Sequence, residues 1–186
     1  MALLTEAELK AYPLPITNVQ WAKIDELDDD QIARVLDYAS QHVEDYLERR
    51  VEETEYIERI QGANRNTVML NNYPVISIEG VSAIDVFGYT RTYSAADFLI
   101  DTDAGIIEWL DKYRNTFLRS YLWTFEYTAG FSTIPGPIKH ATALVVVQML
   151  QPLFRGGTNF TQVDLINESN EAIVDMLERY KRQRIG

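Results

Sequence analysis

The chain has 186 residues, a length typical of one domain that builds its own hydrophobic core. Its 17 Lys and Arg residues stand against 28 Asp and Glu residues, and the formal net charge of −11 disfavours tight binding to phosphate backbones. The absence of cysteine excludes disulfides, thiolate metal sites and a cysteine nucleophile. We expect no membrane segment and no targeting signal, because no apolar stretch is long enough to cross a bilayer and the first residues lack a basic region.

The first expected helix covers residues 5–12. Thr5 and Glu8 have the spacing of a capping box, in which each side chain accepts a hydrogen bond from the other residue's backbone N–H. Pro13 and Pro15 cannot continue a helix, so we expect it to end before them.

A longer helix is predicted over residues 28–50. Asp28, Asp29 and Asp30 stand at its start, where carboxylates favour the positive end of the helix dipole. Its apolar residues recur at helical spacing, so one face should be buried and the other exposed to solvent. These residues are Ile32, Val35, Leu36, Ala39, Val43, Tyr46 and Leu47.

The middle of the chain, residues 51–130, has the pattern of β-structure. β-branched and aromatic residues alternate there between turn signals such as Phe87-Gly88. The expected strands are 51–60, 67–70, 75–86, 98–100, 106–109 and 121–128. In the last of these the aromatic residues, from Tyr121 to Tyr127, should all point to one face. That row suits a core better than a platform for stacking nucleic-acid bases, which would need more flanking cations.

Helices return after residue 130. The segment 137–151 is apolar on most sides, so it should be buried against a sheet or against a neighbouring subunit, and Pro152 should end it. Residues 156–168 have the pattern of a loop with a brief strand, and 169–182 that of a final helix. The whole is an α+β fold.

A search for chemistry finds no catalytic, cofactor or metal signature. His42 and His140 have no second histidine at ligand spacing, and both fit structural or surface roles. The run Asp101–Gly105 places its glycine one residue early for a calcium loop, so a β-turn is the better interpretation. Helix capping explains Asp28, Asp29 and Asp30 better than a metal does. The glycines form no phosphate-binding motif.

Several short strings, in this order and spacing, resemble one known family. They are Thr5–Tyr12, Tyr46–Arg50, Leu70–Ile78, Phe98–Asp101, Gly105–Ile107, Tyr127–Phe131, Ile134-Pro135, Ile138–Ala141 and Leu177–Gly186. In these the chain is similar to the head–tail connector proteins, also called head-completion or adaptor proteins, of long-tailed double-stranded DNA bacteriophages. The likeness extends over nearly the whole chain.

This resemblance implies a structural virion protein at the head–tail interface, assembled in the host cytoplasm. It implies a homo-oligomeric ring, usually twelvefold, that seats on the portal protein, extends the DNA channel and presents a surface to a neck, stopper or tail-terminator protein. No cofactor is implied. Residues 1–160 would form the connector domain, with helices 5–12, 28–50 and 137–151 around the β-rich insertion 51–130, and 161–186 a C-terminal docking arm.

Two groups of residues acquire hypothetical roles from this resemblance. Residues 178–186 carry four Lys and Arg residues against one acid, whereas residues 1–60 carry 15 acids against six bases. The portal-docking residues would be Arg179, Tyr180, Lys181, Arg182 and Arg184. Asp28, Asp29 and Asp30 would face the channel, where carboxylates let DNA slide past without tight binding. A fixed C-terminal helix with a solvated basic end is the alternative for the first group.

Three other functions remain open. The chain could be another neck or tail-completion protein of the same virion. It could be a small acidic cytoplasmic enzyme whose paired carboxylates lie far apart in sequence, or a host protein-interaction module that forms no ring. A pair of carboxylates with raised pKa values in a closed pocket would favour the enzyme.

Overall fold

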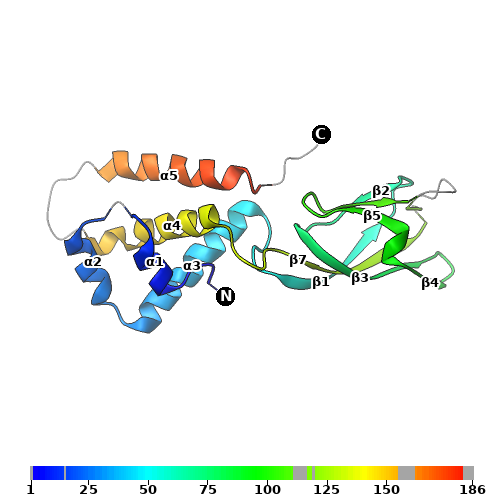
Figure 1. Cartoon of the computed structure of the whole chain (residues 1–186), viewed down its shortest axis with the longest axis horizontal. Helices are drawn as coiled ribbons and strands as arrows, with labels where there is room; N and C mark the ends of the chain where they lie inside the picture. Colours follow the sequence, from blue (N-terminus) through cyan, green and yellow to red (C-terminus); the bar gives the residue numbers. More distant parts are fainter. Residues whose placement is uncertain (1, 15, 111–116, 119, 155–161, 182–186) are drawn as a thin grey trace. The chain divides into compact units, whose positions relative to one another are not determined.

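The computed structural model describes residues 2–14, 16–110, 117–118, 120–154 and 162–181. The chain divides into two compact units. The helical unit contains residues 1–48 and 134–186, and the β unit contains residues 49–133. Two chain crossings, at 48–49 and 133–134, therefore connect the units, because the β unit is inserted between α3 and α4 (Figure 1).

The helical unit consists of α1 (Glu6–Ala11), α2 (Asn18–Asp25), α3 (Asp29–Leu47), α4 (Gly136–Phe154) and α5 (Gln162–Glu178). The predicted capping box of α1 is present, with Thr5 Oγ1 accepting from the backbone N–H of Glu8 at 3.2 Å. Helix α2 was not predicted, and it begins with a capping box of the same kind between Thr17 and Gln20. The helix predicted over residues 28–50 is present as α3, but it ends at Leu47, because Glu48 turns left-handed at φ 56°.

Helix α4 forms the centre of this unit. Every residue from Ala141 to Val147 is buried, and α4 packs against α2, α3 and α5. Both expected burial partners, a sheet and a neighbouring subunit, are therefore wrong for its central turns, because the chain's own helices cover them. Pro152 lies inside the helix rather than after it, and the helix ends two residues later, at Phe154.

The start of α5 also differs from the sequence analysis. Residues 162–168 are helical, whereas we expected a loop with a brief strand there and a helix from 169. The β-branched Val163 and Ile166 raise the strand propensity of this short run. Residues 156–161 of that expected loop lie outside the described part of the chain.

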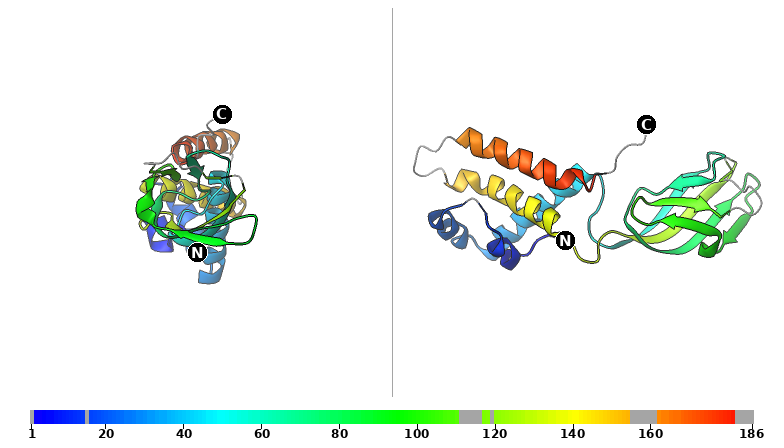
Figure 2. Two further views of the ribbon diagram at one scale, coloured as in Figure 1. Left: turned by 90° about the vertical axis from the view of Figure 1, so that its right-hand side faces the viewer. Right: turned by 45° about the horizontal axis from the view of Figure 1, so that its top comes forward.

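The β unit contains two antiparallel sheets (Figure 1, Figure 2). The larger sheet has the order β1-β7-β3-β4, and the smaller has the order β2-β6-β5. The strands are β1 (Thr54–Gln61), β2 (Thr67–Met69), β3 (Val75–Ile84), β4 (Thr90–Tyr93), β5 (Phe98–Asp101), β6 (Ile106–Trp109) and β7 (Leu122–Ala129). The prediction missed β4 and the short 3₁₀ helix Ala95–Asp97 that precedes β5.

An aromatic core lies between the two sheets. Trp123, Phe125 and Tyr127 of β7 are buried, as their alternation predicted. The Trp123 ring meets Phe117 at 4.9 Å and Trp109 at 5.3 Å between ring centroids. Because these rings are enclosed, the row supplies the core and offers no base-stacking platform.

The two ends of the β unit's chain leave it side by side. The backbone N–H of Phe131 donates to the carbonyl of Val51 at 2.8 Å, and Arg49 stacks on the Tyr73 ring at 3.8 Å and on the Phe131 ring at 5.6 Å. Gly130 between them has φ +116°, and a Cβ there would lie 2.3 Å from the Glu52 carbonyl oxygen. Only glycine fits this approach.

The turn at Asp101–Gly105 is a β-turn, as expected. Asp101 Oδ1 accepts from the backbone N–H of Ala104 at 3.1 Å, and Gly105 is left-handed at φ 65°. Within the described residues, no group of three or more acidic or histidine side chains could hold a metal ion.

Candidate functional site

The three aspartates proposed to face a channel lie at the start of α3, and all three are exposed. Asp28 has a structural task, because its Oδ1 accepts from the backbone N–H of Gln31 at 2.7 Å. Asp29 and Asp30 occupy the first turn, where their charges favour the helix dipole. These three residues therefore both stabilise the start of α3 and present negative charge to solvent.

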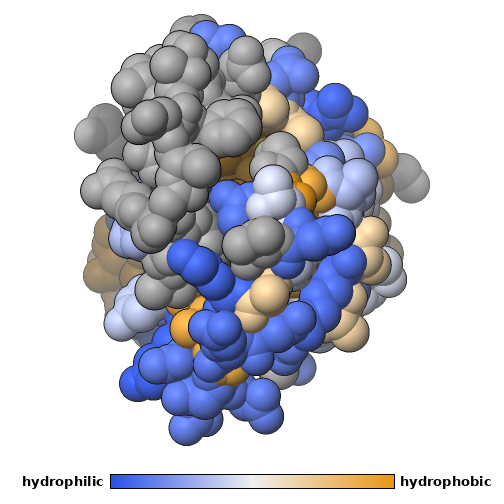
Figure 3. All heavy atoms as spheres, turned by 90° about the vertical axis from the view of Figure 1, so that its left-hand side faces the viewer, coloured by the Kyte–Doolittle hydropathy of each residue, from blue (hydrophilic) through white to orange (hydrophobic). Residues whose placement is uncertain are grey.

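The exposed side of α3 is acidic along its length. Asp37 and Asp45 are exposed like the aspartates at its start, and Arg34 is the one lysine or arginine in the helix. Its Nε donates to the backbone carbonyl of Asp30 at 3.2 Å. On the face shown in Figure 3, hydrophilic residues cover most of the coloured surface.

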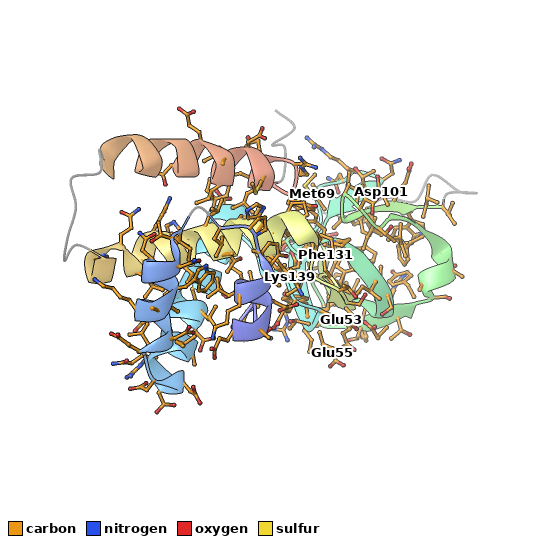
Figure 4. The ribbon with its side chains drawn as sticks, turned by 60° about the vertical axis from the view of Figure 1, so that its left-hand side comes forward. Glu53, Glu55, Met69, Asp101, Phe131 and Lys139 are labelled. Atoms are coloured by element: carbon orange, nitrogen blue, oxygen red, sulfur yellow. The ribbon has the colours of Figure 1, made fainter. Side chains whose placement is uncertain are left out.

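Two lysines in the described part of the helical unit form ion pairs within that unit. Lys139 of α4 reaches α1 and pairs with Glu8 (Figure 4). Lys10 pairs with Asp25 at 2.7 Å and with Glu6 at 3.0 Å. Chiefly because Lys139 donates a hydrogen bond to it, the pKa of Glu8 falls to about 2. These pairs join α1 to α2 and to α4, so they act in folding.

The described part of the C-terminal basic segment is held against α3. The Tyr46 hydroxyl donates to Glu178 Oε2 at 2.9 Å, and Lys181 Nζ lies 4.3 Å from the centre of the Tyr46 ring. Burial raises the pKa of Tyr46, and the hydrogen bond to Glu178 raises it further. The alternative of a fixed C-terminal helix end thus gains support at this point.

The five proposed docking residues have different surroundings. Arg179 is exposed, whereas Tyr180 and Lys181 are half-buried. Arg182 and Arg184 lie outside the described residues. Of the described members, Arg179 is the one whose side chain is mainly in solvent.

Sequence reasoning missed the most exposed apolar group of the β unit. The hairpin tip, residues Asp85–Tyr89 between β3 and β4, exposes 70% of Val86, 82% of Phe87 and 71% of Tyr89. The sequence predicts a strand through residue 86 and a turn at Phe87-Gly88, whereas β3 ends at Ile84. The polar alternation of Thr90–Tyr93 was the available signal for a returning strand and hence for a hairpin.

The histidines take structural or surface positions, as expected. The His140 ring stacks on Tyr12 at 5.4 Å between centroids, and His42 is exposed on α3. Among the described helices, none is both long and apolar enough to span a membrane.

Solved structures show the same fold over almost the full chain. A chain in the neck of an empty gene transfer agent particle, computed with C6 symmetry, is 16% identical, has a TM-score of 0.61 and is matched over 98% of this chain and 95% of that chain. A chain in the virion of the native particle is 18% identical, with a TM-score of 0.65 and coverage of 99% and 92%. A chain in the neck of the native particle, computed with C12 symmetry, is 17% identical, with a TM-score of 0.58 and coverage of 98% and 95%. No curated protein matches the chain in sequence.

The sequence itself matches a family profile. The profile described as head completion protein matches residues 16–182, which is most of the chain. This confirms the resemblance drawn from the short strings, and it identifies a structural protein rather than an enzyme. The chain belongs to the head completion protein family.

Proposed function

We propose that this head completion protein forms a ring at the head–tail interface of a virion, where it seats on the portal, extends the DNA channel and provides the attachment surface for the neck or tail. The observation that carries the proposal is the fold match, over 98% of this chain, to two chains from necks of gene transfer agent particles, computed with C6 and C12 symmetry. Twelve copies is the subunit number that the family resemblance implies.

The C-terminal residues 161–186 are the proposed portal-docking arm. Arg179 supports this role because it is exposed beside a helix end that is otherwise pinned to α3. Because the end of α5 is already held in place, little backbone entropy is lost when the exposed Arg179 contacts an acidic or carbonyl-rich surface. Tyr180, Lys181, Arg182 and Arg184 complete the proposed arm.

The exposed acidic side of α3 is the proposed channel surface. Carboxylates repel the phosphates of DNA, and the acids that Lys10 and Lys139 neutralise, Glu6, Asp25 and Glu8, do not belong to α3. DNA would then pass without tight binding.

A different position in the same neck is the alternative function. The similar folds come from neck assemblies, and this observation supports another neck or tail-completion position as well as the portal-proximal one. Binding to the isolated portal distinguishes the two.

The test is the mass of the purified chain, measured by light scattering alone and after mixing with the portal protein of the same particle. We expect a closed ring of about a dozen copies bound to the portal. Arg179→Glu should weaken portal binding at least tenfold, while Arg59→Glu, an exposed charge reversal on β1, should leave it unchanged. A chain that remains a monomer with the portal present would contradict the proposal.

A further inference from the structure

One side chain of α3 holds the end of α5 at two points. The Tyr46 hydroxyl donates to Glu178 Oε2 at 2.9 Å, and Lys181 Nζ lies 4.3 Å from the centre of the Tyr46 ring. A half-buried tyrosine can make both contacts at once, because its hydroxyl is polar and the face of its ring attracts cations. Figure 2 shows the ends of α3 and α5 side by side.

The two residues that Tyr46 contacts lie on either side of Arg179, in a hydrogen-bonded turn. The backbone N–H of Lys181 donates to the carbonyls of Leu177 and Glu178, both at 3.1 Å, so the chain keeps a helical course just past the end of α5. Side chains three positions apart share one side of such a turn, which is why Glu178 and Lys181 reach the same ring. The backbone at Arg179 is therefore held from both sides.

The side chain of Arg179 is left for a partner. It is exposed, and no residue in the described part of the chain forms a hydrogen bond or an ion pair with it. Lys181, by contrast, is half-buried and places its ammonium on the Tyr46 ring. The two cations of this turn thus differ, because one is available for docking and the other is already used within the chain.

Helix α5 has a separate attachment to α4. The two helices pack together, and Ile173 and Leu177 of α5 are buried. Nearer the start of α5, Gln148 Nε2 donates to Asn170 Oδ1 at 3.0 Å. Removing Tyr46 should therefore leave α5 in place and loosen only its last turn. A loosened turn must be ordered again on docking, which weakens binding.

We propose that Tyr46 is a positioning residue of the portal-docking arm. By holding Glu178 and Lys181, it fixes the place from which Arg179 reaches the portal. Lys181 then anchors the arm and does not contact the portal. This inference rests on the proposed docking of residues 161–186 at the portal, and it adds a residue of α3 to that function.

The first test measures the dissociation constant between the full chain and the isolated portal protein of the same particle. Tyr46→Ala should weaken binding about fivefold, the usual cost of ordering one or two loosened side chains. Tyr46→Phe keeps the ring on Lys181 and loses only the hydroxyl, so it should weaken binding about twofold. Tyr38→Ala is the matched control on α3, because Tyr38 is 62% exposed, and this variant should bind like the unmodified chain.

Two double variants separate positioning from a general loss of stability. In the Arg179→Ala background, Tyr46→Ala should have a clearly smaller effect, because it acts mainly through Arg179. In the Tyr46→Ala background, Lys181→Met should weaken binding no further, because Lys181 has no ring left to hold. Equal effects of Tyr46→Ala with and without Arg179 would overturn the positioning role. A further loss from Lys181→Met would overturn the assignment of Lys181 to anchoring. An unmodified chain that does not bind the portal would instead refute the proposed function.

The second test needs no portal, because it measures amide hydrogen exchange of the full chain. The backbone N–H groups of Tyr180 and Lys181 donate to the Leu177 carbonyl at 2.9 and 3.1 Å. In the Tyr46→Ala variant both should exchange roughly tenfold faster, because the turn opens more often. The buried residues 141–147 of α4 should exchange as in the unmodified chain. Unchanged exchange at the turn, or an equal rise in α4, would overturn the inference.

Discussion

Glu8 is the residue at which the chemistry of the helical unit can be followed most directly. It serves twice: its carboxylate caps α1 by accepting from the Thr5 backbone N–H at 2.9 Å, and it pairs with Lys139 of α4. Both interactions need the ionised carboxylate, and together they hold the pKa of Glu8 at about 2. A group whose folded-state pKa is depressed stabilises the folded state above its unfolded pKa.

We predict that Glu8→Gln removes a stabilisation that is fully present above about pH 4.5 and is lost as the pH falls towards 2. The Glu8 side chain is 38% exposed, so solvent screening limits the contribution to about 1 kcal/mol or less. The measurement is the free energy of unfolding in urea at pH 7 and at pH 3 for both proteins. The difference between them should shrink at the lower pH.

Lys139→Met provides the control for that experiment. In its background, Glu8→Gln should have a clearly smaller effect, because the main partner of the carboxylate is gone. An equal effect with and without Lys139 would show that the ion pair does not lower the pKa of Glu8.

For single residues, hydrogen-bond partners close in the sequence could be predicted, whereas partners far apart in the sequence could not. The capping roles of Thr5, Glu8 and Asp28 could be predicted, because each partner lies three residues away. Lys139 lies 131 residues from Glu8, and only the packing of α4 brings the two together. Tyr46 and Glu178 are likewise 132 residues apart.

Among the elements, α4 decides whether the helical unit folds. Its residues Ala141–Val147 are buried on all sides by α2, α3 and α5. The apolar sequence could not distinguish burial in the chain's own core from burial against another subunit, since both remove the same surface from water.

We predict that Val146→Asp, at a position only 1% exposed, unfolds the helical unit, because an unpaired carboxylate in a closed core costs several kcal/mol. The readout is far-UV circular dichroism with thermal unfolding. Met149→Asp is the matched substitution on the same helix, where 39% exposure lets the charge reach water, and it should fold. A folded Val146→Asp protein that fails only to form rings would restore the subunit-interface interpretation.

The elements that could be predicted are those whose apolar residues recur with a clear helical or strand periodicity. Strand β7 could be predicted with its buried face, because aromatic residues alternate without interruption. Helix α2 was missed because its eight residues carry no clear apolar stripe. Strand β4 was missed because Thr90–Tyr93 is short and mostly exposed, so its pairing with β3 leaves little trace in hydropathy.

For the whole molecule, net charge is the property with the widest consequence. The formal charge of −11 is concentrated in residues 1–60, where 15 acids face six bases. A surface of this sign repels DNA over about 10 Å at 0.1 M salt, which is the screening length. The repulsion acts on passing DNA only if those acids line the ring's channel, which is the proposal under test.

We therefore predict that Asp28→Asn, Asp29→Asn and Asp30→Asn together leave folding nearly intact and slow DNA release from particles. Folding should persist because asparagine caps helices about as well as aspartate. Release should slow because three carboxylates per subunit no longer repel the phosphates, and the effect should grow as the salt concentration falls.

The measurement is the time course of dye accessibility of the DNA after ejection is triggered. Asp97→Asn, Asp101→Asn and Asp103→Asn remove the same charge from exposed positions of the β unit and should not change the rate. If both variants and the unmodified particle release DNA at the same rate, the proposal that the acidic side of α3 lines the channel is wrong.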